Sequence, residues 1–308
     1  MSSLRQALDE YLTLRRQLGY ELKRDGEDLV SFVAFLDAAG ATRITTALAV
    51  QWAKLPTRSH PHRWRQRLGR VRGFACYLAT IDPQHEVPAK DLLPARQVRV
   101  APYLYSQAEV SALLSAARRL TPALLGTTLA TLVGLMATTG LRIGEALALD
   151  RSDVDFRDGI LLVRAGKHRR QRQVPLHDST LAALREYCTL RDRLHPSPST
   201  PAFLLSERGC RFYRTAFYEN FPKLIAEVGL EGRGARKRPR AHDLRHTFAV
   251  RTLLEWHRQG VEIDRKLPVL STYLGHVDPV DTYWYLQATP ELGALVAARL
   301  DGMLGGRS

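Results

Sequence analysis

Six polar residues, spread over four short motifs, could together break a phosphodiester bond without a metal ion. That reaction needs a nucleophile, cations around the non-bridging oxygens, a base for the nucleophile's proton and an acid for the leaving oxygen. In chain order the motifs are TGLRIGE (139–145), GKHRRQRQVPL (166–176), HDLRHTFA (242–249) and LGHVDPVDTYWY (274–285). The candidates they supply are Arg142, Lys167, His242, Arg245, His276 and one of two tyrosines, Tyr283 or Tyr285.

Arg142 follows a glycine break at the start of a predicted short helix, where a guanidinium can donate two parallel hydrogen bonds to phosphate oxygens. The competing interpretation is an ordinary ion pair with Glu145, three residues further on. On the residues of this motif alone, the ion pair is the better prediction.

His242 and Arg245 stand three residues apart, so on a helix both side chains project from the same side and could meet one phosphate. Alternatively, Arg245 pairs with Asp243 or Glu262 and His242 is structural. His242 and His246 also have the spacing of a zinc-binding helix. We do not predict zinc, because the glutamate of HExxH is absent and Arg245 would add positive charge beside the metal.

Lys167 lies where a predicted hairpin strand reaches its turn, among His168, Arg169, Arg170 and Arg172. A lysine beside so many cations loses its proton more easily, which suits a general acid. The alternative is a basic hairpin that only contacts the DNA backbone. For the nucleophile, a tyrosine phenolate attacks phosphorus well and leaves a bond that can be reversed, so rejoining would need no ATP.

Composition directs attention to a polyanionic partner. The chain has 308 residues and a formal net charge of +14, from 45 Lys and Arg against 31 Asp and Glu, which predicts nucleic-acid binding. Its three cysteines lack CxxC spacing, so neither a disulfide framework nor a cysteine zinc site is indicated. The charged N-terminal stretch does not resemble a signal peptide, and the uncharged run 121–141 predicts a buried helix rather than a membrane span. We therefore expect a cytoplasmic, nucleoid-associated protein.

The elements that must position these residues are mainly helical. Residues 3–93 show helical periodicity, and HRWRQRLGRVRGFACYL (62–78) separates an apolar face from a basic face that predicts phosphate contacts through Arg63, Arg67 and Arg70. A linker is expected in 82–103, which contains four prolines. Beyond it, Ser106 is a predicted helix N-cap, Gly140 separates two helices, and residues 160–176 form a predicted β-hairpin.

In order and spacing, the four motifs resemble the tyrosine recombinases, or phage integrases, over roughly residues 106–290. The resemblance implies that Arg142 and Arg245 clamp the scissile phosphate and that Lys167 protonates the leaving 5′ oxygen. It also implies that His242 takes the tyrosine proton and His276 hydrogen-bonds the phosphate. Tyr285, nine residues after His276, matches the nucleophile of that family, whereas Tyr283 does not. Leu286 departs from the family, many members of which have threonine and histidine after this tyrosine.

The resemblance further implies a mainly α fold with a small β-hairpin or sheet, in which two domains clamp DNA. We expect a helical, SAM-like core-binding domain (1–93), a linker (94–105), a catalytic domain (106–290) and a C-terminal helix or tail (291–308) that docks on its own domain or on a neighbouring protomer. Arg169, Arg170 and Arg172 are expected to contact DNA.

The implied activity is site-specific recombination of double-stranded DNA, through a 3′-phosphotyrosyl intermediate and a Holliday junction, by a tetramer on paired sites. No cofactor, metal or membrane is implied. The TYWYL form most resembles transposon- or plasmid-borne recombinases. Accessory recombinases and DNA-bending proteins remain open as partners. The alternatives are relaxation of DNA like a type IB topoisomerase and a DNA-binding regulator without catalysis.

Overall fold

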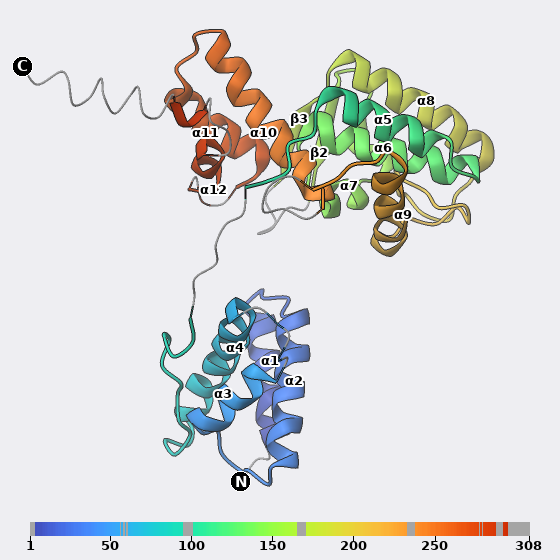
Figure 1. Cartoon of the computed structure of the whole chain (residues 1–308). Coiled ribbons are helices and arrows are strands. Elements are labelled where there is room, and N and C mark those ends of the chain that lie inside the picture. Colours follow the sequence, from blue (N-terminus) through green and yellow to red (C-terminus); the bar gives the residue numbers. More distant parts are fainter. Residues whose placement is uncertain are drawn as a thin grey trace, which may run out of the picture. The chain divides into compact units, whose positions relative to one another are not determined.

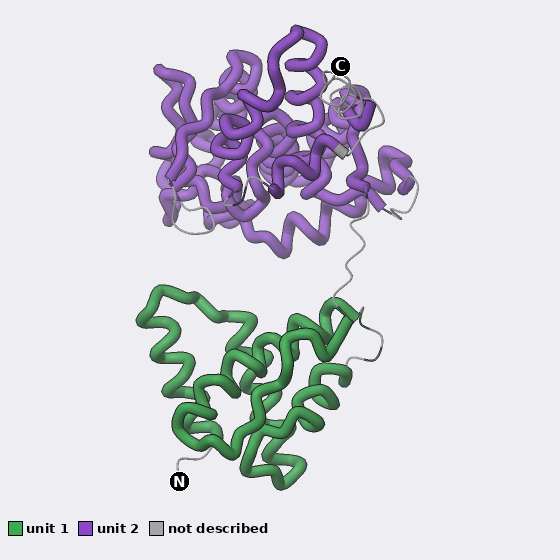
Figure 2. Tube along the Cα trace, turned by 90° about the vertical axis from the view of Figure 1, so that its left-hand side faces the viewer, with its two compact units in different colours: residues 1–99 green, residues 100–308 purple. Residues whose placement is uncertain are grey.

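The structure, a computed structural model, describes residues 4–55, 57, 59, 61–94, 101–164, 171–232, 238–276, 278, 280–287 and 292–294. The chain divides into two compact units, Met1–Arg99 and Val100–Ser308 (Figure 2). This division falls within the proline-containing segment 82–103. Each unit is built around its own buried apolar side chains.

Unit 1 is a group of four helices, shown in blue and cyan in Figure 1. Their bounds are α1 Leu4–Gln17, α2 Lys23–Ala38, α3 Thr46–Lys54 and α4 Pro61–Ala79. Leu8, Phe32, Trp52 and Phe74, one from each helix, are almost fully buried in the shared core. The expected helices are thus confirmed up to Ala79, whereas residues 80–93, also expected to be helical, form turns and irregular structure.

The expected basic face of α4 does not form as predicted. Its apolar face packs inward, but Arg67 is buried as well: its guanidinium lies 3.7 Å above the Trp52 ring and donates to Asp28 and to the Trp52 carbonyl. Arg70 forms ion pairs with Asp25 and Asp28. Only Arg63 of the three keeps an exposed side chain. The prediction of one solvent-facing cationic stripe is therefore wrong, because two of its guanidiniums hold α4 to neighbouring helices.

Unit 2 consists of helices packed around a central helix, with a small sheet at one side (Figure 1). The helices before the sheet are α5 Gln107–Arg118, α6 Ala123–Thr139 and α7 Ile143–Ala148, followed by the 3₁₀ turn η1 Arg151–Asp153. After the sheet come α8 Asp178–Leu194, α9 Arg214–Glu227, α10 Ala241–Arg258, α11 Ile263–Leu274, α12 Val280–Tyr283 and the 3₁₀ turn η2 Trp284–Gln287.

The local predictions for unit 2 are confirmed. Ser106 caps α5 in a reciprocal capping box with Glu109. Helix α6 lies within the uncharged run 121–141 and is buried by contacts with α5, α8 and α10. It ends at Gly140, whose φ of 64° is the left-handed conformation that glycine adopts without strain. In the part of the chain that is described, no helix is both long and apolar enough to cross a membrane.

The sheet has three antiparallel strands in the order β1 (Val154–Asp155), β2 (Ile160–Val163) and β3 (Arg172–Pro175). The predicted hairpin is β2 and β3. Its register pairs Leu161 with Val174 and Val163 with Arg172, so Arg172 shares the face of three buried apolar side chains. An arginine at that position must extend into the protein rather than toward solvent.

A separate apolar cluster joins the second half of α10 to α11 and to the segment that carries the two tyrosines. Val250, Leu267 and Leu274 are buried in it together with Tyr285. The candidate nucleophile is therefore also a core residue of unit 2.

We predict that Arg67→Ala destabilises unit 1 by about 2–4 kcal/mol, because it removes a desolvated cation–π contact and leaves Asp28 with one fewer partner. Faster hydrogen–deuterium exchange of peptides from α3 and α4, measured in the full chain, would report the loss. Arg63→Ala, on the same helix but exposed, should change the free energy of unfolding by less than about 0.5 kcal/mol. Equal effects of the two changes would contradict the buried role of Arg67.

Candidate active site

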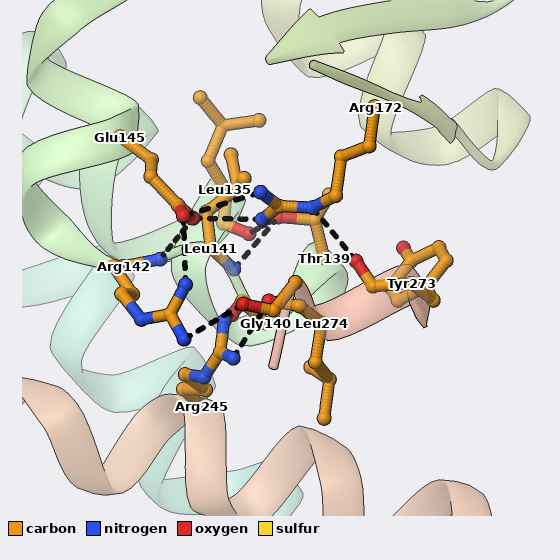
Figure 3. Close-up of polar contacts among 11 residues, drawn as sticks. Leu135, Thr139, Gly140, Leu141, Arg142, Glu145, Arg172, Arg245, Tyr273 and Leu274 are labelled. Carbon is orange, nitrogen blue, oxygen red and sulfur yellow. Dashed lines mark hydrogen bonds and ion pairs between the residues drawn. The ribbon is translucent and has the colours of Figure 1, made fainter. Parts of the chain in front are cut away.

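Three arginines converge on the C-terminal end of α11 (Figure 3). They come from three elements distant in sequence: the residue before α7, the start of β3 and the first turns of α10. Each donates to one of three consecutive main-chain carbonyls. The bonds are Arg172 Nε to Tyr273 (2.8 Å), Arg245 Nη2 to Leu274 (2.7 Å) and Arg142 Nη2 to Gly275 (3.1 Å).

The end of a helix attracts cations because its last carbonyls have no partner within the helix and carry the negative end of the macrodipole. Helix α11 ends there because Gly275 takes the left-handed conformation, with φ of 69°. A Cβ at this position would lie 2.9 Å from Arg172 Nη1. Gly275 thus provides both the helix end and the space for a guanidinium.

Arg245 connects two helix ends. Its Nη1 donates to the carbonyl of Gly140 at the end of α6 (2.7 Å), while its Nη2 holds α11. The alternative interpretation paired Arg245 with Asp243 or Glu262. In the structure, both terminal nitrogens of Arg245 donate to main-chain carbonyls instead. Burial and the nearby charge of Arg142 lower the pKa of Arg245 to about 10, so it stays charged at neutral pH.

Glu145 holds the other two arginines. It accepts from Arg142 Nη1 at 2.9 Å and from both terminal nitrogens of Arg172 at 2.7 and 3.2 Å. Burial disfavours its charged form, but the hydrogen bonds and charge of Arg172 outweigh this and hold the pKa of Glu145 below its usual range. The ion pair considered for Arg142 is therefore present. It coexists with membership of the arginine cluster, and 31 % of the Arg142 side chain remains exposed.

The prediction that Arg172 contacts DNA is wrong, because its side chain points into the protein. Only 11 % of its side chain is exposed, and its guanidinium is engaged by Glu145 and the Tyr273 carbonyl. The register of β3 explains this, because Arg172 points to the same face as Val174. The other hairpin candidates, Lys167, Arg169 and Arg170, lie outside the described residues.

Tyr285 lies against this cluster. It is 2 % exposed, and its ring stacks on His276 with centroids 6.0 Å apart and contacts His246 at 5.4 Å. Burial raises the pKa of Tyr285, whereas the nearby charges of Arg245 and Arg142 act in the opposite direction. Tyr283 is 49 % exposed. Of the two tyrosines in the motif, the structure therefore brings Tyr285 to the arginines.

The three histidines differ in their surroundings. His276 is partly buried, and desolvation together with the charges of Arg245 and Arg142 lowers its pKa to about 3. His242 is exposed and contacts the ring of His246, with centroids 4.6 Å apart in an edge-to-face arrangement. Within the described residues, no third His, Cys, Asp or Glu joins these two side chains in a metal-binding group.

Sequence reasoning missed His246 and Thr282 as members of this site. His246 was considered only as a zinc ligand, although its position four residues after His242 already placed it on the same helix face. Thr282 is 1 % exposed, and its Oγ1 lies 2.7 Å from His276 Nδ1. Its spacing of one helical turn before Tyr285 was the available signal.

Comparison with known proteins assigns the family. Residues 104–291 match the model of the phage integrase family, and the protein y4rB of Sinorhizobium fredii, described as an integrase/recombinase, is 42 % identical over 308 residues, covering 98 % of each chain. The chain belongs to the phage integrase family. It is a tyrosine-type site-specific recombinase. The tyrosine recombinase XerC of Chlamydia trachomatis is 27 % identical over 228 residues, which cover 74 % of this chain and 67 % of XerC.

Solved structures share the fold. The integrase of transposon Tn1549 in complex with a circular intermediate DNA matches with a TM-score of 0.70 at 15 % identity, covering 97 % of this recombinase and all of that chain. A lambda integrase tetramer bound to a Holliday junction matches with a TM-score of 0.63 at 16 % identity, covering 91 % and 79 %. The expected mainly α fold of a tyrosine recombinase is confirmed.

We predict that Gly275→Ala disables the site of this recombinase while Gly260→Ala does not. Both glycines have φ near +70°, so alanine should cost about 1–2 kcal/mol of stability at either position. Only at Gly275 would the new Cβ meet a guanidinium, whereas the space at Gly260 is open. Displacing the arginines should slow DNA cleavage on the order of 100-fold in Gly275→Ala alone.

Single-turnover cleavage rates and thermal unfolding of the two variants check this prediction. Equal cleavage by both variants would mean that the contact between Gly275 and Arg172 does not matter for activity.

We also predict that His276 stays neutral from about pH 5 to 8, because its pKa of about 3 lies far below this window. Its folded pKa lies below the ordinary value of 6.5, so the unfolded chain binds the extra proton first. This group therefore removes stability as the pH falls from 6.5 toward 3. Nuclear magnetic resonance of ¹⁵N-labelled histidine should show no titration of His276 in this range, and normal titration in denaturant. Titration near pH 6 in the folded protein would contradict the desolvated environment.

Proposed function

We propose that this recombinase cleaves and rejoins DNA through a covalent link between Tyr285 and the 3′ phosphate of the broken strand. The observation that carries the proposal is the burial of the Tyr285 side chain beside the arginine cluster, where the charges of Arg245 and Arg142 act against burial and favour its phenolate. Three guanidiniums against the single carboxylate of Glu145 leave two positive charges uncompensated among these four side chains. A phosphodiester would supply one negative charge and offset half of this excess.

In the proposed cleavage step, the Tyr285 oxygen attacks phosphorus and the bond between phosphorus and the 5′ oxygen breaks. His242 takes the tyrosine proton, and Lys167 gives a proton to the leaving 5′ oxygen. Arg142 and Arg245 stabilise the charge on the non-bridging oxygens, each contributing about 3–4 kcal/mol by analogy with single oxyanion-hole donors. Since the phosphotyrosyl bond replaces a phosphodiester of similar energy, a free 5′ hydroxyl can reverse the step without ATP.

We further propose that four copies of the chain act on two double-stranded DNA sites and pass through a Holliday junction. The net charge of +14 supports a DNA partner, and the fold shared with the lambda integrase tetramer supports this assembly. The alternatives remain a topoisomerase-like relaxation of DNA and a regulator that binds without cleaving. The tyrosine held among arginines favours the catalytic reading, because binding alone does not require it.

The decisive experiment uses suicide DNA substrates, nicked near the exchange point and drawn from the sequence that flanks the gene, with EDTA present. Denaturing gels should show a protein–DNA adduct with the wild-type chain and with Tyr283→Phe, but not with Tyr285→Phe. Tyr283 is the matched control because it lies on the same segment with an exposed side chain. A 5′-end label should migrate with the protein and a 3′-end label should be released, as a 3′-phosphotyrosyl bond requires.

Each alternative gives a different result. Loss of the adduct only in Tyr283→Phe would refute the assignment of Tyr285. Relaxation of supercoiled plasmids without dependence on a site would favour the topoisomerase-like activity. Tight and specific binding to a site with no adduct would favour the regulator.

A further inference from the structure

We propose that Thr282 is a positioning residue that holds His276 in the tautomer with its proton on Nε2 and ties this histidine to the segment of the nucleophile. The proposal rests on the proposed function in one respect: it assumes that His276 donates a hydrogen bond to the scissile phosphate. Its structural part concerns the uncomplexed protein and can be tested there.

The contact is short and buried. Thr282 Oγ1 lies 2.7 Å from His276 Nδ1, and Thr282 is 1 % exposed. A hydroxyl can donate or accept, and so can Nδ1, depending on the tautomer. The distance alone therefore does not decide which atom carries the proton.

The surroundings of the hydroxyl decide the direction. Within the described part of the chain, Nδ1 is the hydrogen-bond partner of Thr282 Oγ1. If Nδ1 donated, the buried hydroxyl proton would have no acceptor, and a buried unsatisfied donor is costly. If the hydroxyl donates, its proton is satisfied and Nδ1 acts as the acceptor. A neutral imidazole that accepts at Nδ1 must carry its proton on Nε2.

The charges around the ring support a neutral imidazole. Burial and the neighbouring guanidiniums of Arg245 and Arg142 disfavour a second proton on His276. His276 is thus suited to donate one hydrogen bond through Nε2–H without carrying a charge of its own. The arginines supply the positive charge, and His276 adds a neutral donor. In other sites, too, the hydrogen bond made by one ring nitrogen of a histidine fixes which nitrogen carries the proton.

The hydrogen bond also links two parts of the site. His276 directly follows Gly275, whose carbonyl binds Arg142. Thr282 belongs to α12, one turn before Tyr285. A single side-chain contact therefore fixes the nucleophile segment relative to the arginine cluster, and the stacking of His276 on Tyr285 depends on the ring orientation that this contact sets.

Two substitutions separate this role from simple packing. Thr282→Val keeps the shape of the side chain but removes the hydroxyl, while Thr282→Ser keeps the hydroxyl and removes a methyl group. If Thr282 only filled space, the serine variant would be the more damaged of the two. If it positions His276, the valine variant should be the more damaged.

The first measurement is made on the full, uncomplexed protein with ¹⁵N-labelled histidine, using spectra that correlate ring nitrogens with carbon-bound protons. The signals of His276 are assigned by their loss in His276→Asn. We expect a protonated Nε2 in the wild-type chain and in Thr282→Ser, and a mixture of tautomers in Thr282→Val. A wild-type protein with its proton on Nδ1, or an unchanged spectrum in Thr282→Val, would overturn the proposal.

The second measurement is the single-turnover rate of adduct formation on the nicked substrate at saturating DNA. Thr282→Val should slow it roughly tenfold, the scale of one hydrogen bond, with unchanged DNA affinity. Thr282→Ser should stay within about threefold of the wild type. A valine variant at the wild-type rate, or a serine variant as slow as valine, would show that the hydroxyl has no positioning role. If the wild-type chain formed no adduct, the proposed function would fail, while the spectra would still decide the tautomer.

Discussion

The candidate active site depends on how the main-chain carbonyls at the C-terminal end of α11 are hydrogen-bonded. Three successive carbonyls there, from residues 273 to 275, each accept from a different guanidinium. The carbonyl oxygens and one buried carboxylate offset the mutual repulsion of the three guanidiniums, so that these can lie close together. Because the arginines come from the start of α7, from β3 and from α10, the same bonds fix these elements against α11. The arginine cluster is held in place by these bonds and keeps a net positive charge. An anionic phosphate is expected to bind to it in this state.

Tyr285 shows how packing and chemistry share one residue. Its ring belongs to the apolar cluster of α10 and α11, while the nearby charge of Arg245 acts on its hydroxyl. Burial makes the phenolate less favourable, and the neighbouring cations partly offset this. The uncomplexed chain therefore holds Tyr285 protonated and away from solvent, so the proposed reaction needs a base to take its proton once the substrate is bound.

The sequence predicted this site where local spacing determines geometry. The glycine break at 140, the cap at Ser106 and the β-hairpin follow from such spacing, whereas the choice of Tyr285 over Tyr283 came from the resemblance to the family. Arg67 and Arg172 were assigned to DNA because cationic runs suggest exposed surfaces. The phase of Arg172 with Val174 along β3 did contain the correct answer, since alternate residues of a strand share a face. The Trp52 ring above which Arg67 lies comes from another helix, so no spacing within α4 could reveal it.

The net charge of the chain includes arginines that are bound inside the protein. Several arginines of this recombinase act inside the protein as donors to main-chain carbonyls: Arg191 binds those of Ala202 and Phe203, and Arg211 those of Leu147 and Leu149. A guanidinium that is buried among such partners, as that of Arg191 is, does not reach a DNA phosphate and releases no counterions when DNA binds. The slope of DNA affinity against salt concentration counts only phosphates neutralised by cations that are free to contact them. The formal charge of +14 therefore indicates a DNA partner but overstates how many phosphates the chain can neutralise.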